Sequence, residues 1–108
     1  MKIIRTIYLW YQTLRFKLLN LATIKDLPTD QFNRLIGALV DSGWVKTFEY
    51  DGFDAWIDYG RIKLTKEKLH LTFEWDNWTE GSIEGPRFLI DKIGLENDWQ
   101  VVYQWRWI

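Results

Sequence analysis

The first apolar pattern along the chain has helical spacing. Apolar side chains between residues 3 and 21 recur every three or four positions and fall within one arc of a helical wheel; they are Ile3, Ile4, Ile7, Trp10, Tyr11, Leu14, Leu18 and Leu21. Leu9 and Phe16 lie on the opposite side, where they would contact a second layer or the second subunit of a homodimer. We predict a helix over residues 3–21. An extended segment over residues 14–18 is the alternative, because apolar residues also alternate there.

A second helical pattern follows in LPTDQFNRLIGALVDSG, residues 27–43. Thr29 is the expected N-cap, since its hydroxyl can accept a hydrogen bond from a free backbone N–H, and Asp30 suits the positive helix start. The apolar stripe consists of Phe32, Leu35, Ile36, Leu39 and Val40. Gly43 can adopt the left-handed conformation that ends a helix.

The pattern then changes to the alternation of β-strands, with Asp51-Gly52 between two alternating runs. This dipeptide is typical of a two-residue type I′ hairpin turn. Such a turn pairs Glu49 with Asp54 and Thr47 with Trp56. It also places seven residues together on the inward face: Trp44, Phe48, Tyr50, Phe53, Ala55, Ile57 and Tyr59.

A second hairpin is expected directly afterwards. Ile62 and Leu64 continue the strand, residues 66–69 turn, and residues 69–75 alternate again. With a four-residue turn, Arg61 faces Glu74 and Lys63 faces Thr72. Residues 86–94 predict a short helix with Pro86 at its first position and Gly94 past its end. Residues 99–107 alternate once more and predict a last strand.

The predicted order of elements is α-α-β-β-β-α-β. Because hairpins dominate, we predict an α+β fold: a mainly antiparallel four- to five-stranded sheet with helices packed on one face. The length of 108 residues fits one domain, residues 1–108.

Composition narrows the class of protein. Apolar residues make up 47% and aromatic residues 18% of the chain, with eight tryptophans, so a few positions can build a substantial core. The absence of cysteine excludes disulfides and thiol chemistry and agrees with a cytoplasmic protein. The basic N-terminus lacks the apolar run and cleavage site of a signal peptide, and no run of apolar residues is long enough to span a membrane.

Charge is unevenly distributed although the net charge is only −1. Residues 1–25 carry five basic and no acidic side chains, whereas residues 26–60 carry seven acidic and two basic ones. Nucleic-acid binding requires dense neutralisation of phosphates, so a near-neutral chain argues against it.

No catalytic or metal-binding motif is present. His70, the only histidine, lies four strand residues from Glu74, about 13 Å away and too far for a direct hydrogen bond. The carboxylates of Glu74, Asp76, Glu80 and Glu84 provide the only alternative, a glycosidase-like pair, but a short chain rarely builds the cleft that such a pair needs. No cofactor is expected.

The predicted first hairpin contains an electrostatic conflict. Glu49 directly opposite Asp54 is destabilising, and Asp51 and Asp58 add to the negative charge around Trp56. Local conflicts of this kind are found at functional sites. Trp56 then either lies under a helix or forms the anchor of a binding surface with an acidic rim.

A second group of candidate residues lies in EWDNWTEGSIEGP, residues 74–86, which we interpret as a strand end followed by a loop. Trp75 belongs to the inward-facing set of its strand. Trp78, beside Asp76 and Glu80, either covers the sheet edge or contacts a partner.

We therefore predict a non-catalytic protein-interaction domain that binds a protein partner, with an acidic and aromatic surface suited to a basic one. By analogy alone, inhibitor or immunity proteins of basic toxins use such surfaces. The predicted partner-binding residues are Glu49, Asp51, Asp54, Trp56, Asp58, Asp76, Trp78 and Glu80. The alternatives are small-ligand or carbohydrate binding in a tryptophan-lined hollow of the sheet, and a carboxylate-pair hydrolase. Neither a nucleic acid nor a membrane is an expected partner.

Overall fold

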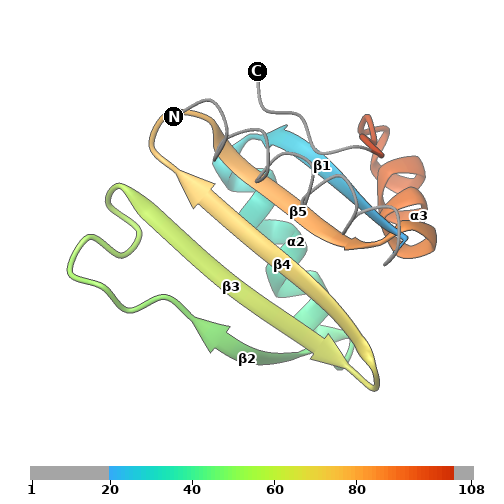
Figure 1. Ribbon diagram of the computed structural model, residues 1–108, viewed down its shortest axis with the longest axis horizontal. Coiled ribbons are helices and arrows are strands. Elements are labelled where there is room, and N and C mark those ends of the chain that lie inside the picture. The colour runs from blue at the N-terminus through green and yellow to red at the C-terminus, as the bar shows by residue number, and fades with distance from the viewer. Residues whose placement is uncertain (1–19, 104–108) are drawn as a thin grey trace, which may run out of the picture.

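A computed structural model describes residues 20–103 of the protein. Five strands and two helices follow one another in this part of the chain (Figure 1). They are β1 (Leu21–Leu27), α2 (Thr29–Asp41), β2 (Val45–Glu49), β3 (Tyr59–Lys66), β4 (Leu69–Asp76), β5 (Glu80–Pro86) and α3 (Arg87–Asn97).

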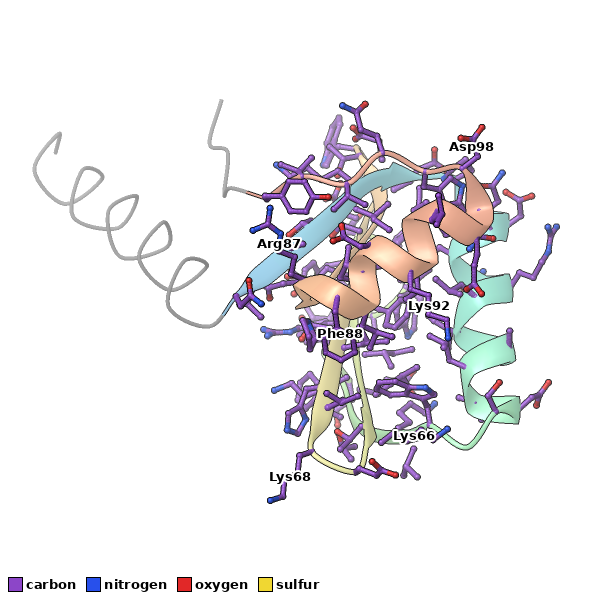
Figure 2. The ribbon with its side chains drawn as sticks, turned by 90° about the vertical axis from the view of Figure 1, so that its right-hand side faces the viewer. Lys66, Lys68, Arg87, Phe88, Lys92 and Asp98 are labelled. Atoms are coloured by element: carbon purple, nitrogen blue, oxygen red, sulfur yellow. The ribbon has the colours of Figure 1, made fainter. Side chains whose placement is uncertain are left out.

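The strands form one antiparallel sheet in the order β1-β5-β4-β3-β2. Figure 2 shows α2 and α3 on the same side of the strands, with side chains filling the space between them. This is the predicted α+β class, with an antiparallel sheet and helices on one face. The order of elements differs from the prediction in detail.

The core lies between the sheet and the two helices. Alternate positions of each inner strand point towards the helices because strand side chains alternate between faces. The buried apolar residues are Ala22, Ile24, Leu27, Phe32, Trp44, Ile62, Leu64, Leu71, Phe73, Ile83, Ile90 and Ile93. The rings of Phe32 and Phe73 pack edge to face, with centroids 5.7 Å apart. This contact packs α2 against the centre of the sheet.

The second predicted helix is confirmed as α2. Phe32 is buried, and Leu35, Ile36 and Leu39 pack against the core, while Val40 is largely exposed. The predicted N-cap is wrong, because the helix begins at Thr29 itself, with Pro28 as the capping position and no side-chain cap from it.

The β3–β4 hairpin is also confirmed. Arg61 pairs with Glu74 and Lys63 with Thr72, as the alternation predicted. The turn joins Lys66 to Leu69 and includes Glu67 with a φ of 57°.

The predicted Asp51-Gly52 turn is wrong. A type I′ turn needs positive φ at both central residues, and neither Asp51 nor Gly52 has it. Instead β2 pairs with β3, with Glu49 opposite Ile62, and residues 50–58 form a loop between them. The destabilising Glu49–Asp54 pair is thereby avoided. The prediction that these residues share an inward face is also wrong, because Phe48, Phe53 and Ile57 are exposed.

Two strands were not predicted. β1 occupies residues 21–27, so Leu21 belongs to a strand and not to the predicted helix. β5 occupies most of the segment that we interpreted as a loop. Its glycines lower strand propensity, but Gly81 and Gly85 face the core, where Phe32 and Leu71 leave no room for a Cβ.

The predictions for the C-terminal helix and for the two ends of the chain also need correction. α3 continues through Gly94 and ends at Asn97, with Asp98 as its left-handed C-cap. At Gly94, Val101 and the carbonyl of Trp99 leave no room for a Cβ. Residues 99–103 form no strand and contribute one bridge, from Val102 to Thr23. The rest of the predicted last strand, the predicted helix up to residue 19, and Leu9 and Phe16 lie outside the described residues.

We predict that Gly81→Ala destabilises the protein by about 1–3 kcal/mol, because the added methyl group would overlap the Phe32 ring in a packed core. Gly37→Ala is the matched control. It lies on the exposed side of α2 with no atom near its Cβ, so it should raise stability by about 0.5–1 kcal/mol. Urea unfolding of both variants measures this. Equal effects would contradict the proposed packing.

Candidate functional site

The candidate site is built on one row of the sheet that contains two glycines. Gly60 of β3, Trp75 of β4 and Gly81 of β5 are direct neighbours across the strands, and all three face the helices. A Cβ on Gly60 would overlap the Trp56 ring, and one on Gly81 would overlap the Phe32 ring. Because both glycines lack a side chain, the Trp56 ring packs on Gly60 and the Phe32 ring packs on Gly81, one on each side of Trp75.

Trp56 reaches this position through an unusual backbone conformation. Its φ is 62°, a region that bulky residues rarely adopt and that costs about 1–3 kcal/mol. The Trp56 amide donates a hydrogen bond of 2.8 Å to the Tyr59 carbonyl, and its indole Nε1–H donates to Glu49 Oε2 at 2.9 Å. These bonds and the contact with Gly60 hold the ring against the core side of the sheet. Of the two interpretations of Trp56, packing towards a helix is the one that the structure shows.

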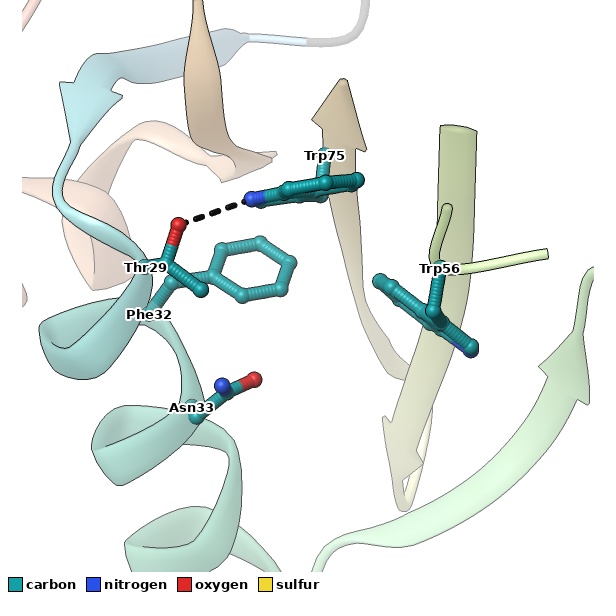
Figure 3. Close-up of a pocket in the computed structure, with 5 residues that line it drawn as sticks. All are labelled: Thr29, Phe32, Asn33, Trp56 and Trp75. Atoms are coloured by element: carbon teal, nitrogen blue, oxygen red, sulfur yellow. Dashed lines mark hydrogen bonds between the residues drawn. The ribbon is translucent and has the colours of Figure 1, made fainter. Parts of the chain in front are cut away.

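A hollow of about 200 Å³ lies between α2 and this end of the sheet. It is lined by Thr29, Phe32, Asn33, Trp56 and Trp75 (Figure 3). The centroids of the Trp56 and Trp75 rings are 6.4 Å apart and their planes meet at 46°. Figure 3 shows both indoles nearly edge-on, with the Phe32 ring beneath Trp75 and between α2 and Trp56.

A hydrogen-bond network fixes the helix side of the hollow. The Trp75 indole Nε1–H donates to Thr29 Oγ1 at 2.9 Å, and the Thr29 hydroxyl in turn donates to Glu80 Oε1 at 2.9 Å. Glu80 Oε1 also accepts a bond of 3.0 Å from the Thr29 backbone amide. Glu80 therefore supplies the acceptor at the start of α2 that the sequence assigned to Thr29.

A second candidate surface lies beyond the hollow, at the end of the sheet where the β2–β3 loop and the β4–β5 turn meet (Figure 1). The Asn77 amide donates to the Asp58 carbonyl at 3.1 Å and joins the two segments. Phe53 is fully exposed, Trp78 is 90% exposed and Ile57 is 65% exposed. We call the side chains of Asp51, Phe53, Ile57, Asp58 and Trp78 the end surface.

The loop that carries this surface is internally bonded. The Ala55 amide donates to the Gly52 carbonyl, and the Tyr50 hydroxyl donates to Asp54 Oδ1 at 2.6 Å. The Tyr50 ring also meets Tyr59 edge to face at 5.1 Å. The exposed side chains therefore stand on a loop with a defined backbone.

The structure gives several predicted site residues a structural role. Glu49 bonds Lys46 and Trp56, and these hydrogen bonds lower the pKa of its carboxyl. Asp54 accepts the Tyr50 hydroxyl, and Glu80 bonds Thr29.

Asp76 closes the β4–β5 turn. It accepts hydrogen bonds from the amides of Trp78 and Thr79 and from the Thr79 hydroxyl. Burial raises the pKa of Asp76, but these bonds outweigh it, so the pKa lies below its ordinary value.

The remaining predicted residues are available for contacts. Within residues 20–103, the carboxylates of Asp51 and Asp58 have no hydrogen-bond or ion-pair partner, and the Trp78 ring points away from the core. Trp78 is therefore not the lid on the sheet edge that one interpretation expected.

The arrangement offers no support for a carboxylate-pair hydrolase. A general acid needs a raised pKa, whereas that of Asp76 is lowered, and Glu80 is occupied by Thr29. Glu74 accepts the Tyr59 hydroxyl at 2.9 Å, and His70 Nδ1 lies 3.0 Å from Thr65 Oγ1, so His70 and Glu74 have separate partners.

Between residues 20 and 103, no group of three or more potential ligands is placed to hold a metal ion. In the same range, neither helix is long and apolar enough to cross a membrane.

Comparisons with protein-family models, curated proteins and solved structures find no match to this chain.

Sequence reasoning missed the residues that build the hollow. Phe32 and Trp75 were assigned only to the core, and Gly60 and Gly81 were not connected with them. The available signal was a tryptophan, Trp75, in one strand and a glycine in each of two other segments, Gly60 and Gly81. These glycines are recognised as neighbours of Trp75 only when the pairing register of β3, β4 and β5 is known.

We predict that Glu80→Ala lowers the free energy of unfolding by about 1 kcal/mol, because it removes both bonds to Thr29 at the start of α2. Glu96→Ala, in the exposed part of α3, is the control and should cost nothing. Thermal unfolding of the two variants measures the difference. A Glu80 variant as stable as the control would contradict the capping role.

We predict a pH dependence from Tyr59. Burial, with the hydrogen bond to Glu74, raises the pKa of Tyr59 to about 12, above the unfolded value of about 10. Its stabilising contribution is therefore complete below pH 10 and is lost as the pH rises through 12. Denaturant unfolding between pH 9 and 12 should show a steeper loss for the wild type than for Tyr59→Phe. Parallel losses would show that the Tyr59 pKa is not raised.

Proposed function

We propose that this protein recognises a protein partner through the end surface. The observation that carries the proposal is the position of three large, exposed apolar side chains, Phe53, Ile57 and Trp78, at one end of the sheet. Aromatic side chains of this kind supply most of the binding energy in protein interfaces when a partner covers them.

The backbone beneath these side chains supports a role in binding. The loop is bonded within itself and to the β4–β5 turn through Asn77 and Asp58. An anchor on a defined backbone loses less conformational entropy on association than one on a loose segment. The proposal therefore favours binding to a preformed surface.

The charge of the surface indicates the kind of partner. Asp51 and Asp58 lie in the same loop as Phe53 and Ile57, and their carboxylates have no partner in the described part of the chain. Their negative charge favours association with a basic surface. The proposed surface includes three residues of the sequence prediction, Asp51, Asp58 and Trp78, and two further residues, Phe53 and Ile57. Trp56 is not part of this surface, because it lines the hollow.

A second candidate function is small-ligand binding in the hollow. It is favoured by two tryptophan rings that line an open space beside the side-chain amide of Asn33, which has no hydrogen-bond partner within residues 20–103. The hollow is formed between α2 and the sheet, whereas the sequence placed it within the sheet. At about 200 Å³ it lies below the usual range of ligand pockets, which favours a small group.

The setting of these functions is also proposed. The lack of cysteine is consistent with a cytoplasmic protein, and the near-neutral net charge with a partner other than nucleic acid. A homodimer through Leu9 and Phe16 stays a prediction.

We predict that Phe53→Ala and Trp78→Ala each weaken partner binding by about 30-fold or more, because each removes an exposed anchor. The partner is first captured from lysate of the native host and purified, and its affinity for each variant is then measured by calorimetry. Leu95→Ala is the matched control: Leu95 is 86% exposed but lies on α3. Wild-type affinity for both loop variants, or an equal loss for the control, would contradict the proposal.

We further predict that Asp51→Asn with Asp58→Asn slows association and makes the rate less dependent on salt, because long-range attraction to a basic partner is removed. Stopped-flow measurements at low and high salt test this. An unchanged salt dependence would rule out a role of these carboxylates in association.

A further inference from the structure

We propose that the hollow between α2 and the sheet binds an organic cation of the quaternary alkylammonium class, such as a trimethylammonium group. This inference rests on the second proposed function, and it names the chemistry of the ligand.

The geometry of the rings provides the first argument. Trp56 and Trp75 are tilted by 46° with centroids 6.4 Å apart, and Phe32 is tilted by 56° from Trp56 at the same separation. Rings inclined to one another can enclose a ligand group, and both indoles line the hollow (Figure 3). The face of an indole carries negative electrostatic potential, so it attracts a cation placed over it.

Charge provides the second argument. None of the five lining residues is charged, so no cation within the wall opposes the ligand. Two carboxylates bond directly to lining residues: Glu49 to the Trp56 indole and Glu80 to Thr29. Lys46 offsets part of the Glu49 charge at 2.7 Å, whereas Glu80 makes no ion pair in residues 20–103. The surroundings of the hollow are therefore more favourable to a cation than to an anion.

Size and polarity distinguish this ligand from a sugar. A sugar ring needs several hydrogen-bond partners, but the Thr29 hydroxyl already accepts from Trp75 and donates to Glu80. Within residues 20–103, Asn33 is the one lining residue whose side-chain polar group has no hydrogen-bond partner. A quaternary trimethylammonium group has no N–H to donate, is weakly hydrated and fits a hollow of about 200 Å³.

The experiment compares choline with its neutral isostere, 3,3-dimethyl-1-butanol, on the full chain at constant ionic strength. Binding is followed through the indole N–H signals in two-dimensional NMR, assigned with single Trp→Leu variants. We expect choline to shift the signals of Trp56 and Trp75 and leave that of Trp78 unchanged. We expect it to bind about tenfold more tightly than the neutral compound, because cation–π attraction adds to the shared apolar contact.

A variant pair tests the site. Trp56→Leu should reduce choline affinity about tenfold or more, while Trp78→Leu, an exposed tryptophan outside the hollow, should bind as the wild type does. If Trp56→Leu does not fold, the affinity ratio and the shifted signals of the wild type still decide the question.

The outcomes separate the inference from the function on which it rests. Equal or tighter binding of the neutral compound would overturn the cation preference but leave small-ligand binding in the hollow intact. No shift at Trp56 and Trp75 with either compound would overturn both. Choline shifts confined to Trp78 would also overturn the inference, since they would place binding on the end surface.

Discussion

The contact between Trp56 and Gly60 determines how this end of the molecule is arranged. Trp75 has a glycine neighbour on each side in the sheet, and each glycine leaves the volume that an aromatic ring occupies. Phe32 fills one such space from α2, and Trp56 fills the other from the β2–β3 loop. Any side chain at Gly60 would displace Trp56, and with it one wall of the hollow and the indole that bonds Glu49. Packing and the candidate site thus depend on the same two glycines.

The same loop links the two proposed functions. Its backbone turns Trp56 inward at the cost of a left-handed conformation, whereas Phe53, three residues earlier, and Ile57, the next residue, are exposed to solvent. Strained residues of this kind often occur where a protein binds or reacts. The inward side of the loop therefore shapes the hollow, while its outward side, with Trp78, forms the end surface. The two surfaces can be tested independently because different side chains carry them.

The sequence predicted the elements whose pattern is local. The stripe of α2 and the alternation of β3 and β4 specified a helix and a register of pairing that the structure confirms. Prediction from the sequence was wrong where contacts between residues far apart in the chain determine the local structure. The glycines of β5 are typical of a loop, and their place in a strand is explained only by the Phe32 ring that packs over Gly81. The Asp51-Gly52 dipeptide is typical of a tight turn, but the loop that forms instead allows Trp56 to pack against Gly60. Of the predicted partner-binding residues, Asp51, Asp58 and Trp78 are exposed, and their role in binding stays a prediction. A tryptophan-lined hollow was an alternative, but its position and its lining residues depend on three strand registers and could not be predicted.

The ring current at Gly60 tests the central claim most directly. If the Trp56 ring lies over Gly60, the α-proton of Gly60 that points towards the helices should resonate well upfield of the random-coil value. This shift should vanish in Trp56→Leu, while the α-protons of Gly37, which has no neighbour on its Cβ side, should not change. A random-coil shift at Gly60 in the wild-type protein would show that Trp56 is not seated there, and the account of the hollow would then be wrong.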